Sequence, residues 1–170
     1  NNIGIETAKM HELTKNFKLK RQNDLSINSW RGLFDSVKDK CSQLHKDLPK
    51  LIEENLTSVE KNWPKDLPKG IIHADLFHDN IFFNKDKFSG IIDFYFSCED
   101  FFALEIAICF NALCFDGVKK NLSFNVTKAK NFIDGYASVR KLSDSEKQSI
   151  KVLSQGAALR FLLTRVFDAL

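Results

Sequence analysis

The pattern of apolar and polar positions divides the chain into two helical regions separated by short strand-like runs. In the first region, apolar residues recur every three to four positions, which is typical of amphipathic helices. Helices are predicted over residues 3–16, from an N-cap at Ser29 to about Leu44, and from an N-cap at Asp47 to about Trp63. Prolines that follow the third segment end the helical pattern.

Three further helices are predicted after the strand-like runs. The most apolar one covers residues 101–115, begins after an N-cap at Asp100 and is closed by Gly117. Since this segment is apolar on nearly every face, we expect it to be buried. Two amphipathic segments follow at residues 127–139 and 144–168, and a Ser-Asp-Ser-Glu sequence that matches a capping box begins the second of them.

The central region alternates short β-branched runs with turn-forming residues, as paired strands do. It reads Gly-Ile-Ile-His-Ala-Asp up to Asp75, Ile-Phe-Phe directly after Asn80, a polar turn at residues 84–87, and then Gly-Ile-Ile-Asp up to Asp93. On this pattern Asp75 and Asn80 lie in the loop between two strands, and Asp93 lies at the end of a third. The predicted fold class is α+β and mainly α, with a small β-hairpin element carrying this loop among about six helices.

Asp75, Asn80 and Asp93 form a combination that suits phosphoryl transfer. This reaction needs a carboxylate that accepts the proton of the attacking hydroxyl, and oxygen ligands for the magnesium ions on the nucleotide phosphates. In kinases an Asp in a His-x-Asp loop takes the first role, an Asn five positions later binds metal, and a second metal-binding acid follows. The three residues have this order and spacing. Each residue alone is more often a turn cap, but the ordered set favours the kinase interpretation.

Composition and charge are those of an ordinary globular protein. Of the 170 residues, 44% are hydrophobic and 28% are charged, and the net charge of +3 is too small to indicate a nucleic-acid partner. The four cysteines show neither a C-x-x-C pair nor metal-ligand spacing, so we expect reduced thiols in a cytoplasmic protein. No signal peptide is recognisable in residues 1–20, and the most apolar stretch is too short to span a bilayer, so no membrane partner is expected.

The central motifs resemble those of a known superfamily. His73-Ala-Asp75-Leu, with Asn80 and then Ile-Asp93-Phe94, is similar to the catalytic segment of the aminoglycoside phosphotransferase and choline kinase-like superfamily, whose fold is related to that of protein kinases. Glu-Ile-Ala-Ile-Cys-Phe-Asn-Ala-Leu-Cys-Phe further on, and Trp-Arg-Gly-Leu-Phe upstream, most resemble bacterial homoserine kinases. The likeness covers most of the chain.

The resemblance implies a role for each motif residue. Asp75 is expected to be the catalytic base toward the substrate hydroxyl, His73 to support the loop, and Asn80 and Asp93 to hold Mg²⁺. ATP is implied as the co-substrate, and homoserine or a similar small amino alcohol as the acceptor, in threonine biosynthesis. The residues that contact adenine and the oligomeric state stay unassigned.

Residues 1–170 are expected to form a single domain, the C-terminal catalytic lobe of such an enzyme. The superfamily's N-terminal lobe carries a phosphate-covering loop and a lysine that pairs with a helical Glu, and neither is recognisable before the first predicted helix. The first residue is not Met and the sequence closes on an apolar helical pattern, so we expect a piece of a longer protein. Because this catalysis depends on positioning and electrostatics, the piece alone is expected to have negligible kinase activity.

Two residues of the chain depart from the superfamily pattern. Glu105 stands where relatives commonly have Asp, and His78 where they commonly have Pro; we expect both to change packing more than chemistry.

An aminoglycoside acceptor is disfavoured because a polycation requires many acids, and few follow Asp93. A non-catalytic remnant is disfavoured because all three motif residues are present. A substrate panel separates the first alternative from homoserine, and coding sequence for a β-rich lobe upstream argues against the second.

Overall fold

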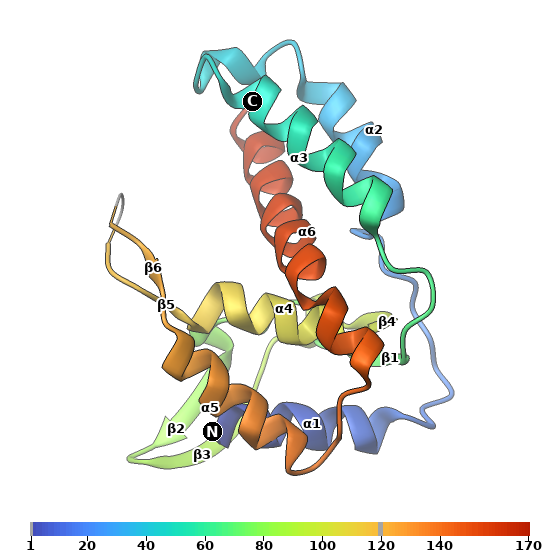
Figure 1. Ribbon diagram of the computed structural model, residues 1–170, viewed down its shortest axis with the longest axis vertical. Helices are drawn as coiled ribbons and strands as arrows, with labels where there is room; N and C mark the ends of the chain where they lie inside the picture. The colour runs from blue at the N-terminus through green and yellow to red at the C-terminus, as the bar shows by residue number, and fades with distance from the viewer. Residues whose placement is uncertain (1, 119–120) are drawn as a thin grey trace.

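The computed structural model describes residues 2–118 and 121–170. In this part of the chain it contains six α-helices and three two-stranded antiparallel sheets, which confirms the predicted, mainly helical α+β class (Figure 1). The helices are α1 (Asn2–Thr14), α2 (Ile27–Val37), α3 (Leu48–Asn62), α4 (Phe102–Leu113), α5 (Val126–Ala137) and α6 (Asp144–Ala169).

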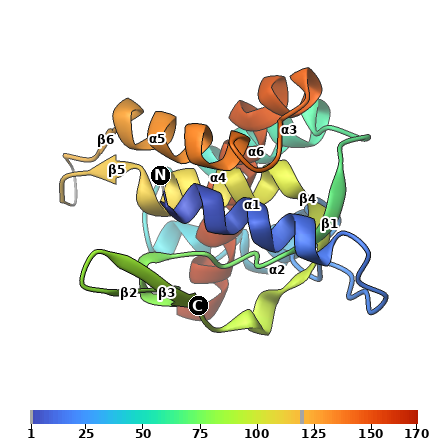
Figure 2. The ribbon, with the colours of Figure 1, turned by 90° about the horizontal axis from the view of Figure 1, so that it is seen from below.

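The helices form two groups that share the long helix α6. α1 packs along α5, and α4 packs against α6. Farther along, α6 packs against α2 and α3, at the end of the molecule opposite α1 in Figure 1. In the view from below, α1 crosses in front of α4 (Figure 2). Buried apolar side chains gather in three clusters: between α1, α4 and α5, around α4 and α6, and between α2, α3 and α6.

α4 is buried, as its nearly continuous apolar surface predicted. Every residue of this helix except Asn111 and Ala112 is buried, and its side chains contribute to two of the three clusters. Its one charged residue, Glu105, is completely buried. A charge at that depth is tolerated only with polar partners, so the partners of Glu105 matter for the site described below.

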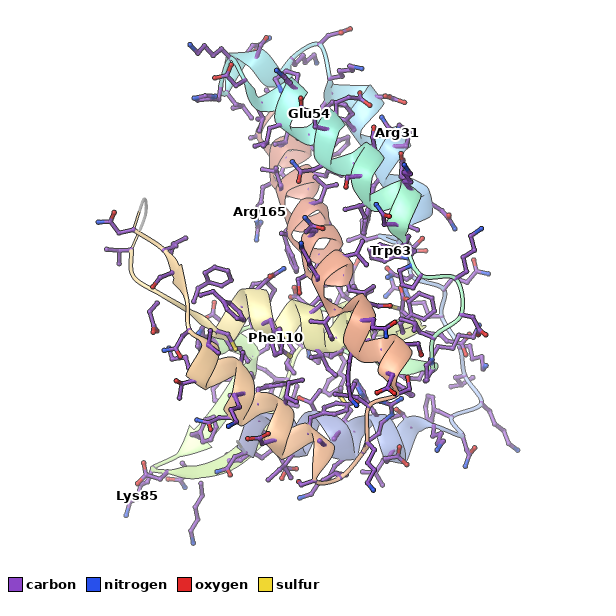
Figure 3. The ribbon with its side chains drawn as sticks, in the orientation of Figure 1. Arg31, Glu54, Trp63, Lys85, Phe110 and Arg165 are labelled. Carbon is purple, nitrogen blue, oxygen red and sulfur yellow. The ribbon has the colours of Figure 1, made fainter. Side chains whose placement is uncertain are left out.

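The described strands form three antiparallel pairs. They are β1 (Lys69–Ile72), β2 (Ile81–Asn84), β3 (Lys87–Ile91), β4 (Cys98–Phe101), β5 (Phe115–Asp116) and β6 (Ser123–Phe124). β2 and β3 make the predicted hairpin, with Lys85 in its turn (Figure 3). β1 pairs with β4, and β5 with β6; the sequence pattern predicted none of β4, β5 and β6. Asp93 lies two residues beyond β3 and not at its end.

The second helix begins earlier than predicted. α2 starts at Ile27, and Ser26 rather than Ser29 occupies the N-cap position. The Trp30 indole N–H donates to the carbonyl of Leu25 at 2.8 Å, so the largest side chain of the helix is tied to the residues that precede it. This tertiary anchor is not visible in the pattern of capping residues.

The second helix also ends earlier than predicted. α2 stops at Val37 and does not continue to Leu44, because residues 38–40 are Lys-Asp-Lys and supply no apolar side chain for burial. A single 3₁₀ turn at Cys41–Gln43 follows. Asp47 occupies the N-cap position of α3, but its side chain makes no capping hydrogen bond there.

Both predicted ends of the α4 segment are corrected. Phe101 is the N-cap, and Asp100 belongs to β4, where its carboxylate accepts the Phe101 N–H at 2.7 Å. The helix ends at Leu113, so Gly117 does not close it. Gly117 lies just after β5 with a φ of 101°, a left-handed conformation that suits glycine.

The last two predicted helices and the capping box are confirmed. α6 covers its predicted segment, whereas α5 ends at Ala137, two residues before the predicted end. In the capping box Ser143 Oγ accepts the Glu146 N–H at 3.2 Å, and the Glu146 carboxylate accepts the Ser143 N–H at 2.9 Å. The four cysteines are free and buried. Within the described residues, no helix is both long and apolar enough to cross a membrane.

Candidate active site

Asp75 lies in a loop whose backbone is hydrogen-bonded to two buried side chains. The loop follows β1, and Ala74 has a left-handed backbone with a φ of 64°, which costs a non-glycine residue roughly 1–2 kcal/mol. Glu105 of α4 accepts hydrogen bonds from the N–H groups of His73 and Ala74, the latter at 3.1 Å. Arg160 of α6 donates from Nη1 to the Ala74 carbonyl at 2.6 Å. Both polar backbone groups of the strained residue are therefore satisfied by side chains.

Asn80 closes the loop from its other end. Its Nδ2 donates to the Asp75 carbonyl at 2.8 Å and, at 3.4 Å, to Oδ2 of the Asp75 carboxylate. Asn80 is buried, whereas Asp75 is partly accessible. Because the amide nitrogen makes these contacts, Oδ1 of Asn80 is left without a hydrogen bond from the described residues and can act as a ligand.

His73 connects this loop to the segment that carries Asp93. Its Nδ1 accepts the Asp75 N–H at 3.3 Å, and its Nε2 faces the Ile92 carbonyl at 2.9 Å. These partners assign the neutral ring with its proton on Nε2. The residue is completely buried, and its ring centroid lies 4.8 Å from that of Phe94. A ring with both nitrogens occupied is suited to positioning the loop.

Asp93 itself is exposed and has few contacts. Its φ of 61° is left-handed, and its Oδ1 accepts the Tyr95 N–H at 3.4 Å. The backbone directly before it is fixed, because the Ile92 N–H donates to the Asn80 carbonyl at 3.1 Å. The structure therefore brings Asp75, Asn80 and Asp93 together from one loop and from the segment that follows the β2–β3 hairpin.

Burial raises the pKa of the Asp75 carboxyl above its usual value of 3.8. The negative charge of Asp93 acts in the same direction, whereas Arg160, His73 and the hydrogen bond from Asn80 oppose the rise. A raised pKa makes this carboxylate a stronger proton acceptor than a fully solvated Asp, which is what a general base requires.

The donor chemistry of Asn80 and Asp93 fits a magnesium ion. Both present oxygen atoms, the donors that Mg²⁺ prefers, and neither oxygen set is consumed by strong contacts to the described residues. Residues 2–118 and 121–170 contain no group of three or more His, Cys, Asp or Glu that could hold a metal ion alone. Magnesium usually takes one or two carboxylates and completes its shell with phosphate and water, so the donor set suits a nucleotide-bound ion.

Two residues that hold the loop were not identified from the sequence. Glu105 was expected to change packing more than chemistry; the structure adds that its carboxylate accepts two backbone hydrogen bonds of the loop. Arg160 was not considered, although it holds the Ala74 carbonyl. Each is a charged residue within an apolar helical pattern, and a charge at a core position is the signal that points to such a role.

A second layer of buried polar residues lies behind Glu105. Nε2 of His11, on α1, is 4.0 Å from the Glu105 carboxylate, and Nδ1 is hydrogen-bonded to the Tyr136 hydroxyl at 2.7 Å. Burial lowers the pKa of His11 from its usual 6.5, against the raising effect of Glu105. The ring is therefore neutral at neutral pH, and the loop contacts of Glu105 do not depend on a charged histidine.

Sequence similarity assigns the chain to a family. A model of the phosphotransferase enzyme family matches residues 2–142, most of the chain, and the match includes Asp75, Asn80 and Asp93. The chain belongs to this family. Homoserine kinases are among its similar relatives: that of Agrobacterium fabrum is 45% identical over 166 residues, which are 98% of this chain and 51% of that protein. The homoserine kinase of Rhodospirillum rubrum is 46% identical over the same shares of 98% and 51%. The chain spans about half the length of these curated relatives.

Solved structures of two other proteins share the fold. A choline kinase from Cryptosporidium parvum has a TM-score of 0.67 at 18% identity, over 98% of this chain and 59% of that one. An aminoglycoside-3'-phosphotransferase of type VIII has a TM-score of 0.61 at 15% identity, over 91% and 60%. The predicted fold, that of a kinase-like phosphotransferase, is thereby confirmed.

Proposed function

We propose that the protein to which this chain belongs transfers the γ-phosphoryl group of ATP to the hydroxyl of homoserine. For the reaction, the observation that carries the proposal is the contact of the Asn80 amide with the Asp75 carbonyl and carboxylate, which leaves the amide oxygen free. For the acceptor, support comes from the 45% identity to a homoserine kinase over 98% of the chain.

In this proposal each site residue has one task. Asp75 orients the attacking hydroxyl and takes its proton, and His73 keeps the Asp75 backbone in place through its two ring contacts. Asn80 and Asp93 hold the metal through their side-chain oxygens. Magnesium, when bound, neutralises charge on the transferred phosphoryl group. The reaction then depends on position and electrostatics, both of which the braced loop supplies.

We also propose that residues 1–170 form one domain, the catalytic lobe, and that a nucleotide-clamping lobe lies elsewhere in a longer protein. The length of the relatives, about twice the matched segment, supports this proposal. The isolated chain is then expected to have negligible activity, because nucleotide would be held from one side only. Comparing ATP- and magnesium-dependent phosphate transfer by the isolated chain and by the longest natural protein tests it. Turnover by the isolated chain near ordinary kinase rates would refute it.

A substrate panel on the longest natural protein tests the acceptor. We expect kcat/KM for L-homoserine to exceed that for choline and for kanamycin by about 10²-fold or more, and activity to require magnesium. A higher kcat/KM for kanamycin would overturn the proposal in favour of an aminoglycoside acceptor. A protein with no transfer to any acceptor would favour the non-catalytic alternative. Cytoplasmic location stays a prediction.

A further inference from the structure

Arg160 is a buried cation that the described residues leave without an anionic partner. The residue is 4% exposed, and its one hydrogen bond in the described chain runs from Nη1 to the Ala74 carbonyl. Nε is buried and has no hydrogen-bond partner among these residues, and no carboxylate there forms an ion pair with the guanidinium. Buried charges are normally paired, because an uncompensated one is strongly destabilising.

The contact with Ala74 uses Nη1, and Nε is fully covered, so Nη2 is the guanidinium nitrogen that is neither covered nor hydrogen-bonded within the described chain. Nη2 carries two N–H donors, and a charged donor of this kind binds a carboxylate oxygen strongly. The rings of Phe161 and Phe96 have their centroids 4.8 and 5.7 Å from the guanidinium carbon. In such apolar surroundings a charge-assisted hydrogen bond is stronger than it is in water.

Arg160 also lies next to the reacting end of the site. Its hydrogen-bond acceptor, Ala74, directly precedes Asp75, and the charges of Arg160 and Asp75 influence each other without forming an ion pair. Phe96, which is 36% exposed, lines a hollow of about 220 Å³ beside the segment that follows Asp93. Because Arg160 contacts the residue directly before Asp75, a small ligand that faces Asp75 has this cation nearby.

We propose that Arg160 binds the carboxylate of the acceptor substrate through Nη2, while Asp75 faces the hydroxyl of the same molecule. This inference rests on the proposed function and deepens it, because it specifies the acceptor as a short hydroxy acid. In homoserine four bonds join the hydroxyl oxygen to the carboxyl carbon, a span short enough for two groups that meet at one loop. Choline and aminoglycosides carry no carboxylate, so Arg160 would distinguish homoserine from them.

The test compares two acceptors that differ by the carboxylate alone. Values of kcat/KM for L-homoserine and for 3-aminopropan-1-ol, which is homoserine without its carboxylate, are measured on the longest natural protein. The variants are Arg160→Met, Arg160→Lys and, as a matched control, Arg165→Met, at an exposed position of the same helix (Figure 3). Thermal unfolding of each variant reports whether it is folded.

Loss of carboxylate recognition predicts a selective effect. Arg160→Met should lower kcat/KM for homoserine about 10²-fold, and that for 3-aminopropan-1-ol no more than about threefold. Arg160→Lys keeps a charge but not the planar guanidinium, and should lose about tenfold on homoserine; it also replaces the Met variant if that variant does not fold. Arg165→Met should match the wild type. Equal losses on both acceptors would show that Arg160 only positions the loop, and would overturn the inference.

The wild type separates failure of this inference from failure of the proposed function. If it phosphorylates both acceptors equally well, the role of Arg160 is overturned and the phosphotransferase activity stands. If it phosphorylates neither, the proposed function fails, and calorimetric binding of L-homoserine decides on Arg160. Weaker binding by Arg160→Lys than by the wild type then supports the inference, whereas equal or absent binding overturns it.

Discussion

The Asp75 loop and the Asp93 segment stabilise a residue with left-handed backbone in different ways. Each contains a non-glycine residue in the left-handed region, Ala74 at a φ of 64° and Asp93 at 61°. Ala74 is 1% exposed, and Glu105 and Arg160 bind its N–H and its carbonyl. Asp93 is exposed, and its carboxylate accepts one backbone N–H at 3.4 Å.

The difference shows which part of the site the fold itself prepares. Strained backbone persists where its surroundings over-determine it, and the buried partners of Ala74 do so. The position of Asp75, the proposed catalytic base, is therefore a property of the packed core. Oδ2 of Asp93 accepts no hydrogen bond from the described residues, and the side chain is exposed, so we expect its final position to depend on the metal and nucleotide that it is proposed to bind.

The largest expected effect is that of Asp75→Asn. Removing the base should lower kcat on homoserine in the longest natural protein by about 10³–10⁴-fold. Stability at neutral pH should equal or exceed that of the wild type, because burial raises the pKa of Asp75 and so disfavours its ionised form in the folded state. That difference should vanish below the usual pKa of 3.8, where the wild-type residue is also protonated.

The control for this variant is Asp79→Asn, an exposed carboxylate of the same loop. It should keep the activity and the stability of the wild type. A similar loss of activity in both variants would indicate a general disturbance of the loop and would contradict the assignment of the base.

Asp93→Asn tests the exposed segment of the site. Weaker metal binding should lower kcat by about 10²–10³-fold and should raise the magnesium concentration needed for half-maximal rate. The free energy of unfolding should stay within about 0.5 kcal/mol of the wild type, since the side chain is exposed. Steady-state rates over a magnesium series, with urea unfolding, measure both. An unchanged magnesium requirement would contradict the metal role.

Glu105→Ala tests the buried hydrogen bonds that hold the Asp75 loop. It leaves the N–H groups of His73 and Ala74 buried without their acceptor, so the free energy of unfolding should fall by about 2–5 kcal/mol. Glu54→Ala is the matched control, an exposed residue of α3 (Figure 3), and should cost no more than about 0.5 kcal/mol. Equal effects of the two variants in urea unfolding would show that the hydrogen bonds of Glu105 to the loop contribute little to stability.

The smallest expected effect concerns His11. Burial lowers its pKa in the folded state, so below the usual 6.5 the unfolded chain takes up a proton more readily than the folded one. The stability contributed by the neutral ring is therefore present above pH 6.5 and is lost as the pH falls. Between pH 7.5 and 5.5 the wild type should lose about 1 kcal/mol more than His11→Asn. His45→Asn, at an exposed position, should follow the wild type; parallel loss in His11→Asn would contradict the assignment.

Local signals in the sequence predicted much of the fold. Apolar spacing located the six helices, a Ser-x-x-Glu pattern located the start of α6, and a polar turn between β-branched runs located the β2–β3 hairpin. The motif spacing also selected Asp75, Asn80 and Asp93, which the structure brings together. These signals were readable because each depends on residues that are close in sequence.

The remaining features depend on contacts between distant parts of the chain. β4 was missed because its strand character comes from pairing with β1, some thirty positions earlier, and not from its own Cys-Glu-Asp-Phe sequence. The start of α2 was missed because the Trp30 anchor decides it. The spacing of apolar residues within a short stretch of sequence reveals neither of these contacts.

By itself, the sequence determined the helices and the hairpin and selected the candidate site residues, since periodicity and motif spacing are local properties. Only the tertiary structure decided what holds those side chains in place. Glu105 and Arg160 reach the loop from residues 31 and 86 positions away from Ala74. Burial there makes their charges effective as partners of the backbone, and burial is a property of the assembled core.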